Sequence, residues 1–409
     1  MNEKELNIKE LVNVRFQNQK FVYDGRRMRS LTSRKVVDYS STLIYEHNPY
    51  KHLLNSIYRR NNTHAVLGLP STTTNRDASY VIHSKFAHLS VNKAKCPVYT
   101  LCWTPDGRRA ISGTGTGEFT LWNGFSFNFE TILQAHENAV RSLQYAPNSR
   151  FLLSTDARGT IKYWHPSMSN MKEFQGHTEA VRDTCFSHDG VFFCSASDDG
   201  TLKVWDTAES LCTAVLKGHG WDVRCCQWHP FMSLIVSGGK DNLLKMWDVR
   251  QKKNTATLHI HKNTILCLKI KKNFPYAFVS GGKDQLLKHT DIRTHKTFTT
   301  YKSHKKEVCS LAFHPASDVF CSGGAEGRIY FWKMGVAEAL YTVDAHDNTV
   351  WDLEYHPIGH VLASGSVDNS VRFWIRDRSV QKSVEVKKPA QTLRKNAPGL
   401  RTSNKNHRI

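Results

Sequence analysis

Tryptophan recurs along this chain at an interval that constrains the fold more than any other feature of the sequence. Six tryptophans are separated by 42, 41, 42, 85 and 42 residues: Trp122, Trp164, Trp205, Trp247, Trp332 and Trp374. The interval of 85 is a double step, and Thr290 occupies its midpoint. Histidines recur in phase, each 28 residues before its tryptophan or, in one repeat, 29 before Thr290: His136, His177, His219, His261, His304 and His346. Two series in phase over six repeats predict an array of one structural unit.

The segments between each histidine and its tryptophan have the composition of short β-strands. In the third repeat, residues 181–186, 191–197 and 202–205 are rich in Val, Phe, Thr and Leu, residue types that favour strands. The turns between them contain Asp and Gly, which favour tight reversals of the chain. Together with the segment after each tryptophan, the pattern gives four strands in ~42 residues. We therefore expect an all-β fold.

Two repeats carry a complete dipeptide signature that resembles the WD40 repeat. Gly176-His177 is followed by Trp205-Asp206, and Gly218-His219 by Trp247-Asp248. The resemblance implies a seven-bladed WD40 β-propeller in which a His, an Asp and a Trp are bonded within one blade. We expect such structural sets at His177, Asp199 and Trp205, at His219, Asp241 and Trp247, and at His346, Asp368 and Trp374.

The His–Asp pairs have the residue types of a catalytic pair, but their repetition favours a structural role. A buried imidazole that bonds a carboxylate satisfies polar groups whose burial would otherwise cost stability. The sequence contains no nucleophile motif, phosphate-binding loop or metal-ligand cluster beyond the repeat. We therefore expect no enzyme activity, no cofactor and no metal.

The repeats are not equal. The histidine position of the first repeat falls at Ala94, and its aspartate position is Thr116; Arg158 and Glu326 replace the aspartate in the second and sixth repeats. These blades are either weakly constrained or reshaped for contact, and the sequence leaves both open. We further expect Tyr80–His88 to form the outermost strand of the last blade and so to close the ring.

Positive charge is concentrated at the two ends of the chain. Residues 1–95 hold 16 Lys or Arg against 7 Asp or Glu, residues 376–409 hold 10 against 2, and the intervening residues hold 30 against 27. We expect three segments: a basic N-terminal arm over residues 1–78, a propeller over 79–378 and a disordered basic tail over 379–409. Such ends are suited to a polyanion or an acidic partner.

The N-terminal arm combines aromatic and basic residues. Tyr23 lies close to Arg26, Arg27 and Arg29, and this combination suits single-stranded nucleic acid, because arginine neutralises phosphate and an aromatic ring stacks on a base. A solvated basic arm and a nuclear-import signal are alternatives. A second aromatic group, Phe125, Phe127 and Phe129, alternates as on one strand face, where core packing is the alternative to RNA contact.

The remaining composition points to an intracellular protein. No run of 18 apolar residues is present, so we expect no membrane span. Residues 1–10 are polar and lack the apolar centre of a signal peptide. The ten cysteines form no CxxC pair and no zinc-finger spacing, and several lie in apolar stretches, which favours reduced thiols in the core.

Several longer strings outside the repeat signature resemble the WD-repeat subunits of eukaryotic pre-mRNA cleavage and polyadenylation factors. These strings are residues 24–29 (DGRRMR), 34–39 (RKVVDY), 92–98 (NKAKCPV), 103–109 (WTPDGRR) and 117–136 (GEFTLWNGFSFNFETILQAH). The likeness covers roughly residues 20–378. It implies a nuclear protein that recognises an AAUAAA-type polyadenylation signal in pre-mRNA. The implied partners are a large multi-propeller scaffold subunit, a CCCH zinc-finger subunit and other cleavage and polyadenylation factor subunits.

The resemblance also assigns roles to individual residues. Two aromatic side chains, carried over to Tyr23 and Phe127, sandwich a base pair that forms within the signal. The basic contacts carry over to Arg26, Arg27, Arg29, Arg34 and Lys35. The alternative function is a protein-only scaffold, whose basic arm docks on a partner subunit without reading RNA.

Overall fold

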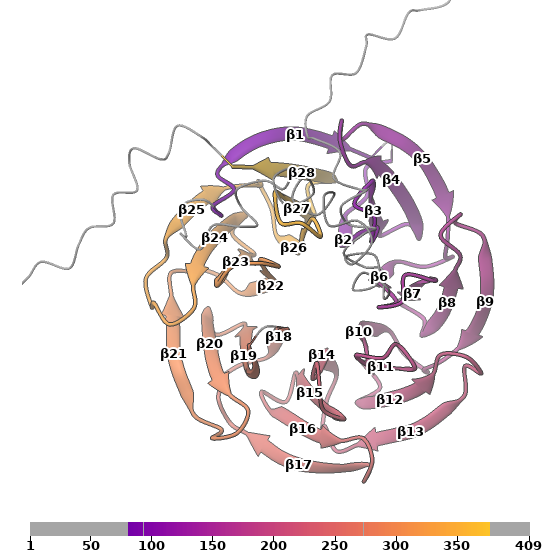
Figure 1. Ribbon diagram of the computed structural model, residues 1–409, viewed down its shortest axis with the longest axis vertical. Coiled ribbons are helices and arrows are strands. Elements are labelled where there is room, and N and C mark those ends of the chain that lie inside the picture. The colour runs from indigo at the N-terminus through magenta and orange to yellow at the C-terminus, as the bar shows by residue number, and fades with distance from the viewer. Residues whose placement is uncertain (1–80, 93, 273, 377–409) are drawn as a thin grey trace, which may run out of the picture. The chain divides into compact units, whose positions relative to one another are not determined.

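Seven four-stranded antiparallel sheets form a closed ring, as the sequence predicts (Figure 1). The computed structural model describes residues 81–376 except Lys93 and Asn273. Within these residues the secondary structure is all β, and no helix is long and apolar enough to span a membrane.

Each sheet is one blade, with its first strand innermost and its last strand on the outer rim. Blade 1 consists of β2 Val98–Trp103, β3 Arg109–Thr114, β4 Glu118–Asn123 and β5 Phe129–Gln134, and blade 2 of β6 Val140–Tyr145, β7 Leu152–Asp156, β8 Thr160–Trp164 and β9 Asn170–Gln175. Blade 3 consists of β10 Val181–Phe186, β11 Phe192–Ser197, β12 Thr201–Asp206 and β13 Cys212–Lys217, and blade 4 of β14 Val223–Trp228, β15 Leu234–Gly239, β16 Leu244–Asp248 and β17 Lys253–Leu258. Blade 5 consists of β18 Ile265–Lys271, β19 Phe274–Gly282, β20 Leu286–Asp291 and β21 Thr297–Lys302. Blade 6 consists of β22 Val308–Phe313, β23 Val319–Gly324, β24 Arg328–Lys333 and β25 Tyr341–Asp344. Blade 7 consists of β26 Val350–Tyr355, β27 Val361–Ser366, β28 Ser370–Ile375 and β1 Lys85–Val91.

The ring is closed by β1, which precedes blade 1 in sequence but forms the outermost strand of blade 7. It pairs antiparallel with β28, from Lys85 opposite Ile375 to Val91 opposite Ser370. The predicted closing strand is confirmed, although it begins five residues later than Tyr80. Because hydrogen bonds join the first and last strands of the ring, blade 7 cannot separate from blade 1 without breaking a sheet.

The hydrophobic core lies between neighbouring blades. One cluster joins Val98, Trp122 and Phe127 of blade 1 to Val361 and Phe373 of blade 7, and similar clusters recur around the ring. This arrangement explains why the inner three strands of a blade are mostly apolar, because one face of each sheet packs against the preceding blade and the other against the following blade. The outermost strands alternate or are largely exposed.

The expected His–Asp–Trp sets are hydrogen-bonded through a buried serine in blades 3, 4 and 7. In blade 4, His219 Nδ1 lies 2.8 Å from Asp241, His219 Nε2 lies 2.7 Å from Ser237 Oγ, and Trp247 Nε1 donates to that same oxygen at 2.8 Å. The sets His177, Asp199, Ser195 and Trp205 and His346, Asp368, Ser364 and Trp374 repeat this geometry. Every histidine nitrogen in these sets therefore has a partner.

The irregular blades keep parts of the network. In blade 2, where Arg158 replaces the turn aspartate, Asp156 from the end of β7 lies 3.6 Å from His136 Nδ1. In blade 6 the longer Glu326 reaches His304 Nδ1 at 3.2 Å. The sequence pattern missed Asp156, because it lies two positions before the expected one. Both irregular blades therefore keep a carboxylate close to the histidine ring.

Candidate functional site

Six of the seven residues predicted to contact RNA lie outside the described part of the chain. These are Tyr23, Arg26, Arg27, Arg29, Arg34 and Lys35. The limits of the N-terminal arm and the C-terminal tail lie outside it too, so these assignments stay predictions.

Phe127, the seventh residue, is part of the core rather than an exposed stacking surface. The residues before it form a turn, in which the Phe127 amide donates to the Asn123 carbonyl at 2.8 Å and the Phe127 φ is 60°. The ring is 0% exposed and stacks on Phe373, with centroids 4.3 Å apart. The Ser90 hydroxyl also donates to the Phe127 carbonyl. Phe127 therefore presents no ring face to a base, and its prediction as a stacking residue is corrected.

Phe129 is the exposed aromatic of this segment. It is the first residue of β5, is 41% exposed and meets Trp122 edge-on at 6.1 Å. The expectation that residues 125, 127 and 129 share a strand face fails because the strand starts only at residue 129, after the turn. The next residue, Glu130, accepts from Arg109 Nε at 2.6 Å. The alternation of residue types along the sequence cannot show that a turn interrupts a series of aromatic residues.

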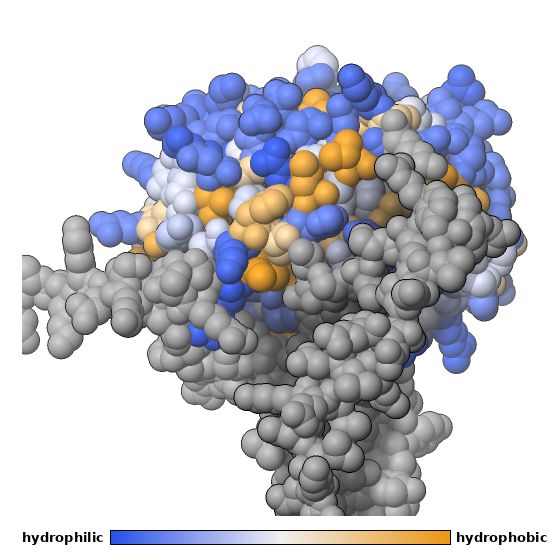
Figure 2. Space-filling view, turned by 90° about the horizontal axis from the view of Figure 1, so that it is seen from above, coloured by the Kyte–Doolittle hydropathy of each residue, from blue (hydrophilic) through white to orange (hydrophobic). Residues whose placement is uncertain are grey.

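Exposed apolar side chains also lie on β1, on the neighbouring part of the outer rim. Phe86, Leu89 and Val91 are 49%, 43% and 55% exposed. Figure 2 looks onto this edge of the ring, where apolar side chains form a band across a mostly polar surface.

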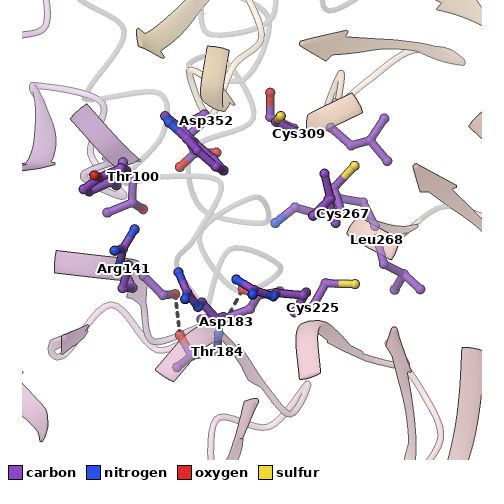
Figure 3. A pocket seen from close by; sticks show the side chains of 18 of the residues that line it. Thr100, Arg141, Asp183, Thr184, Cys225, Cys267, Leu268, Cys309 and Asp352 are labelled. Carbon is purple, nitrogen blue, oxygen red and sulfur yellow. Dashed lines mark hydrogen bonds between the residues drawn. The ribbon is translucent and has the colours of Figure 1, made fainter. Parts of the chain in front are cut away.

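The innermost strands surround a cavity of about 350 Å³ at the centre of the ring (Figure 3). In every innermost strand the first and third residues pair with the neighbouring strand, and the second residue is left out of the pairing as a β-bulge. Such bulges redirect a side chain out of the regular alternation. Those second residues all line the cavity and together form what we call the channel mouth: Tyr99, Arg141, Arg182, Arg224, Leu266, Cys309 and Trp351.

Aromatic and basic side chains of the channel mouth contact one another. Trp351 meets Tyr99 edge-on at 5.9 Å, and the Arg141 guanidinium lies 4.2 Å from the centre of the Tyr99 ring. Arg182 pairs with Asp198 at 2.5 Å, and Arg224 pairs with Asp222 at 2.8 Å. This surface could not be predicted from the sequence, because its members are ~42 residues apart and differ in type.

Deeper in the cavity a lysine is surrounded by acidic side chains. Lys269 of β18 faces Asp183, Asp352 and Glu354, which line the same cavity. Burial raises the pKa of Asp183 to about 6 and that of Glu354 to about 7. Burial works against the charge on Lys269, but the three carboxylates raise its pKa above the ordinary value. The interior of the cavity therefore holds an excess of acidic groups.

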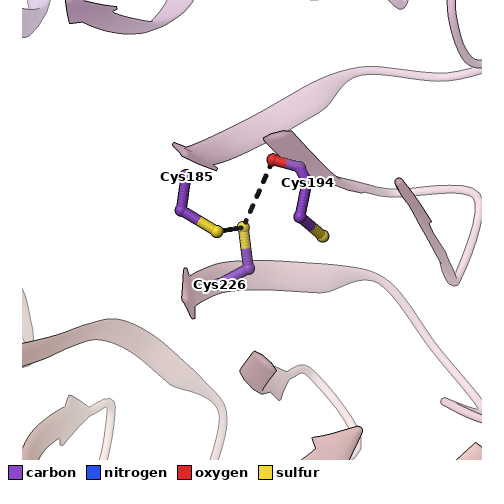
Figure 4. A group of neighbouring side chains, drawn as sticks. All are labelled: Cys185, Cys194 and Cys226. Atoms are coloured by element: carbon purple, nitrogen blue, oxygen red, sulfur yellow. Dashed lines mark hydrogen bonds between the residues drawn. The ribbon is translucent and has the colours of Figure 1, made fainter. Parts of the chain in front are cut away.

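Three buried cysteines lie close together between blades 3 and 4 (Figure 4). The sulfur atoms of Cys185, Cys194 and Cys226 lie within 4.8 Å of one another, and Cys185 Sγ is 3.5 Å from Cys226 Sγ. All three pack in an apolar cluster with Val204, Ile235 and other side chains. Burial raises the pKa of Cys194 and Cys226. These thiols fit the expected core role.

Comparison with known proteins identifies the repeat. The family model described as WD domain, G-beta repeat matches residues 127–165, 168–206, 210–248, 295–333 and 337–374. The fold is a seven-bladed WD40 β-propeller. The matched segments correspond to blades 2, 3, 4, 6 and 7, each preceded by the outermost strand of the blade before. The three inner strands of the irregular first blade, and those of the fifth blade, which lacks its tryptophan, lie outside the matched segments.

The WD40 propeller is similar in sequence to fungal proteins named Polyadenylation factor subunit 2. It is 41% identical to the Neurospora crassa protein over 248 residues, and 42% identical to the Gibberella zeae protein over 254 residues. These alignments cover 59% and 61% of this chain but 38% and 42% of the relatives. The Saccharomyces cerevisiae protein of the same name is 40% identical over 134 residues, which are 32% of this chain and 29% of that protein. The chain thus spans less than half the length of these relatives. The resemblance predicted from the sequence is confirmed.

Proposed function

We propose that this WD40 protein is a nuclear, non-catalytic subunit of the machinery that cleaves and polyadenylates pre-mRNA. In this role it helps to recognise an AAUAAA-type signal and holds other subunits together. The similarity to proteins named Polyadenylation factor subunit 2 carries the proposal. The structure supports a binding role, because the repeated His–Asp pairs are bonded into the blades and are not arranged around a substrate cavity.

The proposed RNA contact combines the basic arm with the rim of blade 1. Tyr23 and Phe129 form the aromatic pair, with Phe129 in place of Phe127 because its ring is exposed on β5. Arg26, Arg27, Arg29, Arg34 and Lys35 neutralise phosphates. Arginine contacts make the affinity salt-dependent, whereas stacking contributes ~1–3 kcal/mol per base.

The test compares three phenylalanine variants of the full chain, each assembled with the zinc-finger and scaffold subunits. Phe129→Ala is expected to weaken binding of an AAUAAA oligonucleotide by roughly tenfold, as expected for one lost stacking contact. Phe125→Ala is the matched control, because Phe125 is half-buried in the preceding turn, and it is expected to bind normally. Phe127→Ala is expected to lower stability by about 3–5 kcal/mol, as for other buried phenylalanines.

Two outcomes would contradict the RNA-binding proposal. Unchanged affinity of both Phe129→Ala and Tyr23→Ala would exclude the aromatic pair. If Arg26, Arg27 and Arg29 substitutions abolished assembly while RNA crosslinks mapped to other subunits, the chain would be a protein-only scaffold. A salt titration of the Arg26→Gln variant adds an independent check, because each lost phosphate contact lowers the salt slope by about one.

A further inference from the structure

We propose that the channel mouth binds an acidic peptide segment of a partner protein, with a carboxylate on Arg141 and an apolar or aromatic neighbour against Tyr99 and Trp351. This site is distinct from the proposed RNA contact. Phe129 lies on the outermost strand of blade 1, whereas the channel-mouth residues lie on the innermost strands.

The geometry of the bulges provides the first argument. Seven independent strands each place the second residue at the same end of the cavity, next to the loops that join the blades. Three consecutive blades contribute arginine there, and the next two around the ring, blades 1 and 7, contribute aromatic rings. Charged and aromatic groups are therefore separated into two adjacent sectors. A ligand with an anionic group beside an apolar group matches this division.

Arg141 lacks a carboxylate partner among the described residues. Arg182 and Arg224 are paired with Asp198 and Asp222, but among the described residues no carboxylate pairs with Arg141. Its Nε atom is buried without a hydrogen-bond partner. Burial and the nearby charge of Arg182 lower the pKa of the Arg141 guanidinium. A buried, unpaired donor costs stability, so an incoming carboxylate would gain a charge-assisted hydrogen bond and offset the repulsion between the arginines.

The surroundings favour a carboxylate over a polyphosphate chain. Asp198, Asp222 and Glu307 alternate with the basic groups around the opening, and an excess of carboxyl groups lies deeper in the cavity. A chain of phosphates places adjacent charges next to these acids, whereas a peptide can direct one carboxylate to Arg141 and others to Lys240 and Lys283. The volume of about 350 Å³ is at the lower end for small-ligand pockets and suits one or two side chains.

Exposed groups beside the opening extend the surface. Trp221, in the loop before β14, is 62% exposed, and Lys240 lies 5.5 Å from its ring. Lys240 and Lys283 occupy the equivalent turns of blades 4 and 5, and both line the cavity. These lysines attract further acidic residues of the same peptide and increase its association rate.

The test measures binding of a fluorescein-labelled 12-residue peptide, composed of four Asp-Phe-Glu repeats, to the full chain by fluorescence anisotropy. Arg141→Gln is expected to weaken binding by about tenfold or more, the loss typical of a charge-assisted hydrogen bond. Lys217→Gln removes the same charge from exposed β13 on the outer rim and is expected to change binding less than twofold. Arg141→Lys, which keeps the charge but loses the planar fork, is expected to fall between them.

Further measurements distinguish binding at the channel mouth from nonspecific electrostatic attraction between an acidic peptide and a basic protein. A peptide with Asn and Gln in place of the acidic residues is expected not to bind, and Trp351→Ala is expected to weaken the acidic peptide without unfolding the chain. Phe129→Ala is expected to leave the peptide affinity unchanged. Failure of the peptide-site proposal is therefore distinguishable from failure of the RNA-contact proposal. Equal losses in Arg141→Gln and Lys217→Gln would overturn the peptide site. So would a 12-nucleotide single-stranded RNA that crosslinks to Tyr99 or Trp351 and depends more strongly on Arg141.

Discussion

The serine at the centre of each blade network offers a test in which the chain supplies its own control. Ser237 Oγ in blade 4 accepts a hydrogen bond from Trp247 Nε1 and lies 2.7 Å from His219 Nε2. Ser280 Oγ in blade 5 lies 2.8 Å from His261 Nε2, but no tryptophan donates to it because Thr290 occupies that position. Both serines are completely buried.

The expected losses follow from the number of polar groups left unpaired. Ser237→Ala leaves the indole N–H and one imidazole nitrogen without a partner, and Ser280→Ala leaves one imidazole nitrogen. Each unpaired buried group costs about 1–3 kcal/mol, so Ser237→Ala should cost roughly 2–6 kcal/mol and Ser280→Ala about half as much. At roughly 2 °C per kcal/mol for a protein of this size, the melting temperatures should differ by several degrees.

Differential scanning calorimetry of the two variants and the unmodified chain measures this difference. Blade 1 provides a second control, because Ser112 Oγ accepts from Trp122 but has no histidine, with Ala94 at that position. Ser112→Ala should therefore resemble Ser280→Ala. Equal destabilisation by Ser237→Ala and Ser280→Ala would refute the reasoning and show that the tryptophan bond adds nothing to stability.

Three further predictions concern acid, thiols and the second blade. His83, His314 and His356 are buried, and burial lowers the pKa of His83 to about 3 and those of His314 and His356 to about 4. Because the unfolded chain binds these protons near pH 6.5 and the folded chain does not, stability should fall as pH falls from 6.5 towards 4. His83 alone should account for about 2 kcal/mol between pH 7 and pH 5, and a urea-unfolding series in which His83→Phe loses as much as the unmodified chain would contradict this. Nine of the ten cysteines are buried and Cys212 is exposed, so a thiol reagent should modify one sulfhydryl in the folded chain and all ten after denaturation, and Cys212→Ser should abolish the native reaction. Asp156→Ala should lower the melting temperature more than Arg158→Ala does, because Asp156 accepts from the Arg158 and Thr160 amides and lies 3.6 Å from His136 Nδ1; the reverse order in a thermal-shift measurement would rule out a stabilising role for Asp156.

The repeat periodicity was sufficient to predict the ring, because each blade is encoded by local strand and turn signals that recur in register. The closing strand was predictable for the same reason: a ring with seven repeats needs a fourth strand for its last blade. Its first residue was misplaced by five, since strand ends depend on pairing with β28 and not on the residues of β1 alone. Phe127 and Phe129 show the same limit, as a turn with positive φ decides which ring is buried.

The sequence by itself determined the strand composition, the number of blades and the bonded His–Asp–Trp sets, all of which depend on residues at fixed spacing. Only the tertiary structure decided which side chains meet across blades. Asp156 reached His136 from an unexpected position, and Trp351 came to lie against Tyr99, 252 positions away in the chain. The physical reason is closure: once the ring forms, the bulged second residues of seven separate strands point into one cavity, and no local pattern in the sequence records that they are neighbours.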